Sequence, residues 1–381
     1  MIIKRQVRNI ELNKIAIVVK SEGLEFDDRV RKVCLALHKN FYVKIFIVQD
    51  NNEEKAKGVT SYGIGYEAIK LKTRNCLPRA KFLFIKTLEF YFRVKPLLKD
   101  FDFIWYNEEK TFLFPLLASR KQKFIWDQHE IPMLFCIGWK RKIFQIIERK
   151  AQKIIHANPQ RIEYLKSINL IKHPEKHDYV HNYPDNEYIR STSIPKCYDN
   201  FIHWLKGERY VYLQGLNAKD RFPFNSIASI LNVTDNKIIV VGNVENEAKS
   251  SLINLYPRLK ERVFFAGMVA QLDIPILMKN AQFTIVLYEN AKPNNRYCEA
   301  NRMYQAMSLG VPIIVGNNPS MAEVVKDKYG IVLKSDGADI KELENAILIL
   351  NKDFSFYKYN CKIDSKKYVW NDNMIKTEWL K

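Results

Sequence analysis

Three polar side chains, Tyr297, Asn301 and Gln305, are spaced four residues apart in the stretch PNNRYCEANRMYQAMSLGVPIIVG. On a helix, this spacing places them in one row on one face. The row would begin at the N-terminus of the helix, where free backbone amides suit a phosphate. These residue types in this pattern therefore favour a polar ligand that carries negative charge.

A second stretch with residues suited to phosphate is QGLNAKDR, which follows the apolar run RYVYL. Gly215 would let the backbone approach a ligand closely, and Lys219 and Arg221 would supply positive charge. A strand followed by a glycine turn and cations before a helix is the pattern of a phosphate cradle. We therefore expect a phosphorylated ligand to lie against this loop.

His129 follows another apolar run, KFIW, in the tetrad DQHE. An imidazole at the carboxyl end of a parallel strand can reach a ligand in a cleft between domains. A single histidine can also be a buried structural residue, so both interpretations of His129 stay open. The Asp100-Phe101-Asp102 motif lies at the amino end of a strand, away from the usual ligand edge. We interpret it as a solvated turn and predict no metal site.

These residues need a framework, and short apolar runs predict two sets of parallel strands. The first set comprises residues 14–19, 43–48, 103–106, 123–126 and 154–157, and the second 209–213, 237–241, 262–267, 283–287, 311–315 and 330–333. Helical patterns separate the strands, so the fold class is α/β, with two Rossmann-like domains, helices on both faces of each sheet and a cleft between the domains.

The predicted domain boundaries follow from these patterns. The first domain spans residues 1–190 and gains a final crossing helix at about 366–381, while the second spans 207–365. The polar residues 186–206 are interpreted as an irregular linker. In the second domain we expect a helix from about Tyr297 to Leu309, which Gly310 ends. Met303, Ala306 and Met307 would pack that helix on the sheet.

The chain is strongly basic, with a net charge of +19. Residues 1–190 hold 36 Lys and Arg against 22 Asp and Glu, which is 14 of those 19 charges. Two stretches in this half, 79–99 and 134–153, mix cations with aromatic residues, as at a membrane interface. We expect peripheral contact with an anionic membrane. Core helices with a solvated basic face, or a basic composition without a partner, are the alternatives. No nucleic-acid-binding motif accompanies the charge.

Targeting and redox features are few. No apolar run approaches 18 residues, and the first residues have no apolar core of a signal peptide. The six cysteines show no CxxC pair and no zinc spacing. We therefore expect a cytoplasmic protein, peripheral at the inner face of the plasma membrane.

The segment ANRMYQAMSLGVPII resembles the donor-site helix of GT-B glycosyltransferases of the group 1 (family 4) branch, which often reads Pro-Asn-Lys-x-x-Glu-Ala-x-x-x-Gly-x-Pro-Val-Ile. Other parts resemble the same branch in the same order: DDRV, DQHE, HNYPD, VFFAG and YVWN. The resemblance covers most of residues 14–375. Two departures concern the site, because Gln305 replaces the glutamate that holds the donor ribose and Tyr297 replaces its partner, with Glu299 nearby.

The resemblance implies roles for individual residues. The diphosphate of the donor would contact Gly215, Lys219 and Arg221, and the backbone at Gly267 would contact the nucleotide base. Glu299, Asn301, Arg302 and Gln305 would complete the donor site, with Gln305 on the ribose or sugar. His129 would contact the donor sugar or its phosphate, and the acceptor would lie near Gly23 and Glu130.

The expected function is transfer of a sugar from a nucleotide-diphosphate sugar to a glycan or lipid-linked acceptor, as in bacterial surface polysaccharide synthesis. The resemblance implies retention of the anomeric configuration, and neither a metal nor another cofactor is expected. One alternative keeps the fold but makes the protein a nucleotide-sugar epimerase. Another is a non-catalytic subunit that binds a sugar nucleotide or glycan, which the changes at Tyr297 and Gln305 favour. A nucleic-acid-binding protein is the third.

Overall fold

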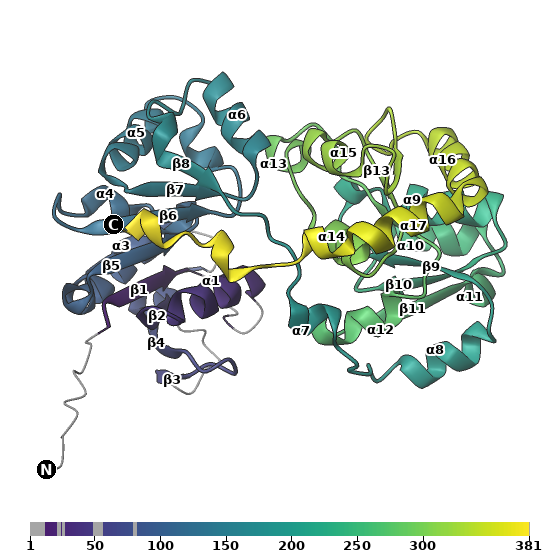
Figure 1. Cartoon of the computed structure of the whole chain (residues 1–381), viewed down its shortest axis with the longest axis horizontal. Coiled ribbons are helices and arrows are strands. Elements are labelled where there is room, and N and C mark those ends of the chain that lie inside the picture. Colours follow the sequence, from purple (N-terminus) through teal and green to yellow (C-terminus); the bar gives the residue numbers. More distant parts are fainter. Residues whose placement is uncertain (1–11, 21–23, 25–26, 49–55, 79–81, 381) are drawn as a thin grey trace, which may run out of the picture. The chain divides into compact units, whose positions relative to one another are not determined.

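The structure is a computed structural model that describes residues 12–20, 24, 27–48, 56–78 and 82–380 (Figure 1). Contacts within the chain divide it into two compact units. The first unit runs to Val180 and includes 372–381, and the second runs from His181 to Asn371. The change of unit at Val180 falls ten residues before the boundary expected from the sequence.

The first unit contains one eight-stranded sheet with the strand order β3-β4-β2-β1-β5-β6-β7-β8. All pairs are parallel except β3 with β4. The strands are β1 (Lys14–Val19), β2 (Tyr42–Val48), β3 (Lys57–Val59), β4 (Gly65–Ile69), β5 (Phe103–Asn107), β6 (Lys123–Gln128), β7 (Lys153–His156) and β8 (His177–Tyr179). The helices are α1 (Asp28–His38), α2 (Lys72–Cys76), α3 (Leu83–Val94), α4 (Leu113–Leu117), α5 (Lys140–Lys150) and α6 (Pro159–Ser167).

The second unit contains a six-stranded parallel sheet with the order β11-β10-β9-β12-β13-β14. Its strands are β9 (Tyr210–Gln214), β10 (Lys237–Val241), β11 (Val263–Gly267), β12 (Thr284–Val286), β13 (Ile313–Val315) and β14 (Gly330–Val332). Its helices are α7 (Asn186–Ile189), α8 (Tyr198–Leu205), α9 (Pro223–Val233), α10 (Asn246–Leu255), α11 (Leu259–Arg262), α12 (Ile274–Met278), α13 (Pro293–Arg296), α14 (Asn301–Ser308), α15 (Pro319–Val325), α16 (Ile340–Lys352) and α17 (Phe354–Asp364).

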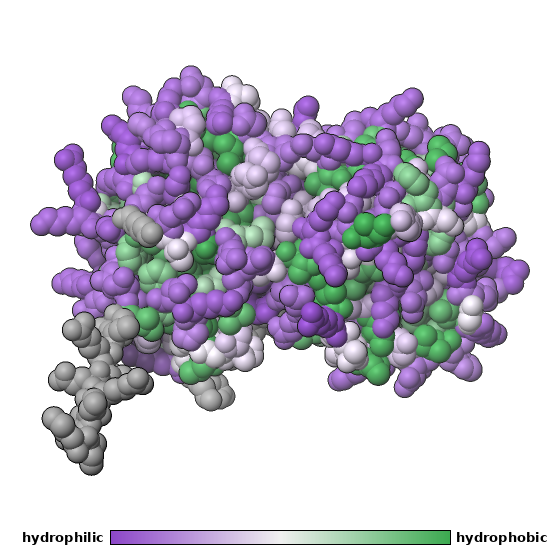
Figure 2. All heavy atoms as spheres, viewed as in Figure 1, coloured by the Kyte–Doolittle hydropathy of each residue, from purple (hydrophilic) through white to green (hydrophobic). Residues whose placement is uncertain are grey.

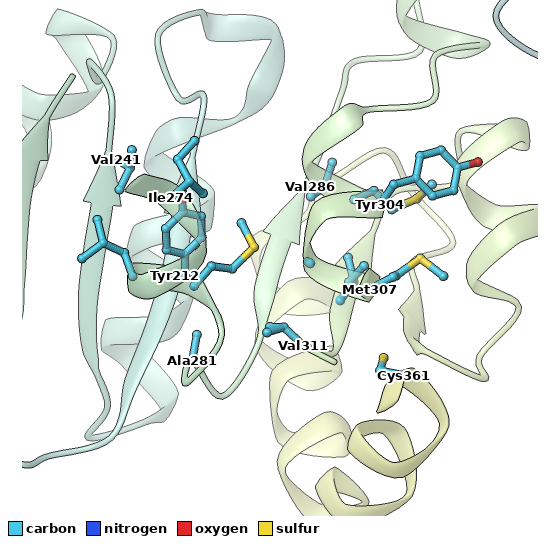
Figure 3. Close-up of a cluster of buried hydrophobic side chains, with 14 of the residues drawn as sticks. Tyr212, Val241, Ile274, Ala281, Val286, Tyr304, Met307, Val311 and Cys361 are labelled. Atoms are coloured by element: carbon cyan, nitrogen blue, oxygen red, sulfur yellow. The ribbon is translucent and has the colours of Figure 1, made fainter. Parts of the chain in front are cut away.

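Helices cover both faces of the second sheet, as the alternation along β9 shows. Tyr210 and Tyr212 belong to one buried cluster, and Val211 and Leu213 to another. Figure 3 shows part of the first cluster, where Tyr212 lies near Ile274 of α12 and Met307 comes from α14. The expected packing of Met303, Ala306 and Met307 on the sheet is confirmed, since all three are buried in this cluster.

Each sheet has a switch point, where the chain stops adding strands on one side of a central strand and begins to add them on the other side. In the first unit, β2 and β4 lie on one side of β1 and β5 lies on the other. In the second unit, β10 and β11 lie on one side of β9 and β12 on the other. The crevice outside the carboxyl ends of such strands is where α/β sheets bind ligands. The two switch points, β1/β5 and β9/β12, are therefore where functional residues are expected.

Three of the segments predicted from the sequence differ in the structure. The expected helix 297–309 is shorter, since α14 begins at Asn301 and Ala300 before it is extended. The expected irregular linker 186–206 contains α7 and α8, because Phe201 and Leu205 are buried in the core cluster and order the segment. The expected helix 366–381 is instead three short 3-10 helices, Ser365–Tyr368, Asp372–Met374 and Thr377–Leu380.

Candidate active site

The β9/β12 switch point carries the strongest candidate site in the second unit. Gly215 follows β9 directly and has a positive φ of 73°, which glycine adopts without strain. Its carbonyl accepts hydrogen bonds from Nη1 of Arg221 at 2.9 Å and from Nη1 of Arg302 at 3.1 Å. A Cβ added to Gly215 would overlap the Arg302 guanidinium and lie 3.1 Å from Nη1 of Arg221. Two guanidinium groups therefore converge on one glycine.

Arg302 is 8% exposed and reaches Gly215 from the first turn of α14. It donates to the carbonyls of Gln214 at 2.5 Å and Leu287 at 3.4 Å, which lie at the ends of the two central strands. Its Nε is buried without a hydrogen-bond partner among the described residues. Burial, and then the positive charge of Arg221, lower the pKa of Arg302 from its usual value. This environment favours an anion.

Tyr288, which follows β12, lies beneath both cations. The guanidinium carbon of Arg302 is 4.9 Å from the centre of the Tyr288 ring, and that of Arg221 is 5.4 Å from it. Cation–π contacts hold guanidinium planes in place without neutralising them. Neither arginine forms an ion pair with a carboxylate among the described residues. The pair thus keeps its charge for a ligand, and diphosphate oxygens match the planar donors of arginine.

Lys219 does not join this pair. Its ammonium group forms an ion pair with Glu247 in the first turn of α10, and both side chains are more than two-thirds exposed. The hydrogen bond and charge of Glu247 raise the pKa of Lys219. Both Lys219 and Arg221 follow Gly215 in the sequence, and both were predicted to supply positive charge to a ligand. The structure brings Arg221 to the glycine and turns Lys219 toward α10.

The predicted polar row of Tyr297, Asn301 and Gln305 lies only in part on α14. Asn301 is exposed at the first helical position, and Gln305 is buried one turn later. Tyr297 lies outside the helix, so it does not share a helical face with them, contrary to the expected row. The reason is local, because Ala300 adopts an extended conformation before the first turn. Asn301 and Gln305 remain four residues apart on one helix.

Glu299 is held by a residue distant in sequence. Its Oε2 lies 2.6 Å from Nδ1 of His181, and its side chain is 4% exposed. The His181 ring stacks on Tyr183, with centroids 5.0 Å apart. Glu299 thereby fixes the segment that begins the second unit to the residues before α14. Sequence reasoning had singled out HNYPD as a motif without assigning a role to His181.

Gly267 lies beside Gly242 at the carboxyl ends of β11 and β10. Both glycines have positive φ, and the Gly242 amide donates to the Gly267 carbonyl at 2.7 Å. A cavity of about 520 Å³ adjoins these strand ends, and Asn217, residues 242–246, Lys249 and Phe265 line it. The cavity is polar and lies within the second unit, next to the loop that carries Arg221.

His129 lies in the first unit after β6, beside a buried ion pair. Asp127 is fully buried and binds Arg29 through two hydrogen bonds, of 2.8 and 3.2 Å. Nε2 of His129 is 3.7 Å from Asp127, and Nδ1 is 3.7 Å from Glu108. Burial alone would lower the pKa of His129, but the charge of Asp127 outweighs it and raises that pKa. A cationic imidazole is thus favoured here.

Glu108, beside His129, is a residue that sequence reasoning missed. It follows β5 with φ 60° and ψ 165°, a conformation that costs a non-glycine residue about 1–3 kcal/mol. Its amide donates to the Asp127 carbonyl at 2.7 Å, and its own carbonyl accepts from Nε1 of Trp126 at 3.1 Å. These bonds join β5 to β6 and impose the strain. No sequence pattern reveals such a conformation.

The remaining predicted residues of the first unit are Glu130 and Gly23. Glu130 follows His129 at the same carboxyl edge and is exposed. Gly23 lies outside the described residues. Among the residues that the structure describes, no group of three His, Cys, Asp or Glu side chains could hold a metal ion.

Residues 225–359 match the family model described as Glycosyl transferases group 1. The matched region runs from α9 to α17 and includes α14, with Arg302 and Gln305. The second unit therefore carries a group 1 glycosyltransferase domain, and the protein is a glycosyltransferase. A search of curated proteins gives no match.

Solved structures show that the whole chain has the GT-B fold of two Rossmann-like units. Sucrose-phosphate synthase from Thermosynechococcus elongatus has a TM-score of 0.75 at 15% identity, over 97% of this chain and 98% of its own. HepE from Anabaena, in complex with UDP-glucose, has 0.69 at 16%, over 96% and 98%. WaaG, a glycosyltransferase involved in lipopolysaccharide biosynthesis, has 0.62 at 13%, over 92% and 95%.

Proposed function

We propose that the protein transfers a sugar from a nucleotide-diphosphate sugar to a glycan or lipid-linked acceptor. The observation that carries this proposal is the Arg221–Arg302 pair, which converges on Gly215 at the β9/β12 switch point. Two unneutralised guanidinium groups in a partly buried site favour an anion, and a diphosphate supplies two charged groups. HepE, which shares the fold, was crystallised with UDP-glucose.

Cleavage of the donor leaves negative charge on the departing diphosphate. Arg221, Arg302 and the first amides of α14 would stabilise this charge, so the reaction needs no metal ion. The neighbouring cavity of about 520 Å³ would take the nucleoside, close to Gly242 and Gly267. Gln305 would hydrogen-bond the ribose or the sugar through its amide. The family resemblance adds retention of configuration to the proposal.

In the first unit, His129 and Glu130 are proposed to act on the donor sugar and the acceptor. The Asp127 carboxylate keeps its negative charge, because Arg29 holds its pKa far below the usual value although burial alone would raise it. That charge favours a protonated His129, which would contact a sugar hydroxyl or a phosphate oxygen. Lys219 is proposed to act only if a ligand separates it from Glu247.

The acceptor side is proposed to meet an anionic membrane at its periphery. Apolar side chains are exposed before and in the first turn of α3 (Phe82, Leu83, Phe84 and Ile85) and before α5 (Ile137 and Trp139). Lys140, Arg141 and Lys142 follow Trp139 directly. Aromatic residues beside cations suit the headgroup region of a bilayer. Figure 2 shows charged and polar residues over most of the visible face, with apolar patches between them. No helix among the described residues is long and apolar enough to span a bilayer.

The test is a thermal shift of the protein with UDP, GDP, ADP and CMP, each with and without EDTA. We expect one nucleoside diphosphate to raise the midpoint, because a ligand that binds the folded state stabilises it. The shift should survive EDTA. Arg221→Gln should lose at least tenfold in affinity for that nucleotide, while Arg258→Gln, which changes an exposed arginine of the same unit, should bind normally.

Three outcomes would contradict the proposal. Equal nucleotide affinity in the Arg221 and Arg258 variants would show that the diphosphate does not bind to the arginine pair. Intact donor binding without any turnover would instead support the non-catalytic subunit, for which Gln305 and Tyr297 are the motivating residues. Release of a free, epimerised donor sugar without an acceptor would identify the epimerase.

A further inference from the structure

The β1/β5 switch point of the first unit carries two lysines, beside the acids Glu108 and Glu109 that follow β5. Lys20 follows β1 directly, and Lys110 lies in the 3-10 helix after β5, Glu109–Thr111. Since β1 and β5 are adjacent and parallel, their carboxyl ends share one edge of the sheet. This is the position where an α/β sheet binds a ligand. None of the residues proposed for sugar transfer occupies it.

Lys20 is anchored to the start of α3. Its ammonium group donates to the hydroxyl of Thr87 and, at 3.5 Å, to the carbonyl of Leu83. It forms no ion pair with a carboxylate among the described residues. Lysine without such a partner is unfavourable in a half-buried position unless a ligand supplies the negative charge.

Three further cations lie close enough to act on Lys20. Burial and the charges of Lys110, Arg74 and Lys86 lower the pKa of Lys20 to about 8. Lys86 is 4% exposed, and its ammonium group donates to the Pro78 carbonyl at 2.6 Å. Nζ of Lys110 lies 3.7 Å from Oε2 of Glu108. We call Lys20, Arg74, Lys86 and Lys110 the Lys20 group. The charges of the other three cations disfavour a charged Lys20, and a bound anion would offset that repulsion.

Exposed apolar side chains lie next to Lys20, before and in the first turn of α3. Leu83, whose carbonyl Lys20 contacts, is exposed, as are Phe84 and Ile85 in the same first turn of α3. Phe82, before the turn, is also exposed and has φ 58°. A ligand that matches this surface has an anionic head for the Lys20 group and an apolar chain for α3.

We propose that the Lys20 group binds the phosphate or diphosphate of a lipid-linked acceptor, whose apolar chain lies along Phe82–Ile85. This inference rests on the proposed sugar transfer and names the class of acceptor. An acceptor held by its phosphate at the carboxyl edge of β1 would be oriented by the first unit independently of the donor. The Lys20 group and the Arg221–Arg302 pair are thus two phosphate sites with separate ligands.

Binding of farnesyl diphosphate, inorganic pyrophosphate and farnesol by isothermal titration calorimetry tests the proposal. The titrations use the whole protein, saturated with whichever nucleoside diphosphate it binds, so that the donor site is filled. We expect Lys20→Gln to weaken farnesyl diphosphate at least tenfold, while Lys121→Gln, at the opposite edge of the sheet before β6, leaves it unchanged. Lys110→Gln serves as a second variant if Lys20→Gln does not fold.

The apolar part of the site has its own matched pair of variants. Phe84→Ser should weaken farnesyl diphosphate but leave pyrophosphate unchanged, because only the former has an apolar chain. Phe92→Ser changes an exposed phenylalanine in the last turn of the same helix and should alter neither. Equal effects of the two phenylalanine variants would overturn the assignment of α3.

Other outcomes separate this site from the alternatives. Equal affinity of Lys20→Gln and Lys121→Gln for farnesyl diphosphate would overturn the proposal and leave the donor site untouched. Loss of nucleotide binding in Lys20→Gln would assign the Lys20 group to the donor instead. If Lys20→Gln weakened binding to phosphatidylglycerol vesicles as much as binding to farnesyl diphosphate, the Lys20 group would recognise bulk membrane headgroups. Failure of the Arg221 test concerns the proposed transfer alone.

Discussion

At the scale of single residues, the backbone conformation and contacts of Gly215 lead to a specific prediction. Gly215→Ala would place a non-glycine residue at φ 73°, which costs about 1–2 kcal/mol, and would also push the Arg302 guanidinium away from the loop. We expect nucleotide affinity to fall at least tenfold, as measured by thermal shift. Gly207→Ala is the control, because Gly207 has φ 76° but no atom within 4 Å of an added Cβ. If both variants weaken nucleotide binding to the same extent, backbone strain explains the effect and the displaced Arg302 guanidinium does not.

His129 offers a second prediction at this scale. Removing the imidazole takes away the partly exposed group that Asp127 holds in its charged form. We expect His129→Ala to lower turnover at least tenfold in an assay of sugar transfer, with an unfolding midpoint close to that of the wild type. His173→Ala, which changes a partly exposed histidine of the same unit, should keep the wild-type rate. Wild-type rates in His129→Ala would exclude His129 from the site.

The arginine pair also shows what the residues alone could not reveal. Gly215 and Arg221 were predicted from their spacing after β9, since a glycine turn and a cation form a local pattern. Arg302 lies 87 residues from Gly215, and its contact with the Gly215 carbonyl depends on how α14 packs. Tyr288 carries no motif at all, although its place directly after a predicted strand was a usable signal. Contacts that are distant in sequence were therefore the part that the pattern missed.

At the scale of elements, the loop between β12 and α14 depends on one asparagine. Asn318, before α15, is fully buried, and its Nδ2 lies within 3.1 Å of the carbonyls of Tyr288 and Asn295 and of Oδ1 of Asn290. Asn318→Ala would leave buried carbonyls unpaired, at about 1–3 kcal/mol each. We expect a lower thermal midpoint and weaker nucleotide binding, since Tyr288 supports both arginines.

The neighbouring Asn317 provides the control for Asn318. It is exposed, and its amide donates to the Lys334 carbonyl at 2.5 Å. Asn317→Ala should change the free energy of unfolding by less than about 1 kcal/mol and should hardly shift the midpoint, because exposed groups exchange their hydrogen bonds with water. A similar midpoint in the two variants would show that Asn318 does not hold the loop.

The elements themselves were largely predictable. Continuous apolar runs give the buried parallel strands directly, so β1, β10 and most others fall within one or two residues of their predicted bounds. Strands β3, β4 and β8 were missed. The three-residue strands β3 and β8 carry too few apolar positions for a period, and β4, with the sequence GYEAI, has no continuous apolar run. The start of α14 was misplaced since Glu299 bonds His181, 118 residues away, and no local signal marks the extended residue between them.

At the scale of the whole molecule, the two switch points divide the chemistry between the units. The second unit holds two arginines at β9/β12. Arginine stays charged, and its planar guanidinium can form two hydrogen bonds with one phosphate. The first unit holds lysines at β1/β5 and the Asp127–His129 pair on the next strand, β6. The charge imbalance visible in the sequence, with most of the net charge in residues 1–190, agrees with anionic ligands for the first unit as well. The composition predicts the charge, but the strand order is needed to place it at an edge of the sheet.

A buried pair of histidines makes the stability of the first unit depend on pH. Nε2 of His156 lies 2.8 Å from Nδ1 of His177, whose Nε2 lies 3.1 Å from Glu148. Burial lowers the pKa of both histidines below the usual value, most strongly for His156. The unfolded chain therefore binds more protons below about pH 6.5, and each neutral histidine costs about 1.4 kcal/mol of stability per pH unit there.

Because the folded pKa values are lowered, this stability is fully present above pH 6.5 and is lost as the pH falls. His129 acts in the opposite direction, since its pKa is raised, so the net loss between pH 7.5 and 5.5 should be about 1–3 kcal/mol. Urea unfolding at the two pH values measures it. His177→Gln should lose less stability over this interval than the wild type, whereas His203→Gln, an exposed histidine of α8, should lose as much. Identical pH dependence in all three proteins would place the acid sensitivity outside the histidine pair and leave the carboxylates, which titrate below about pH 5, as its source.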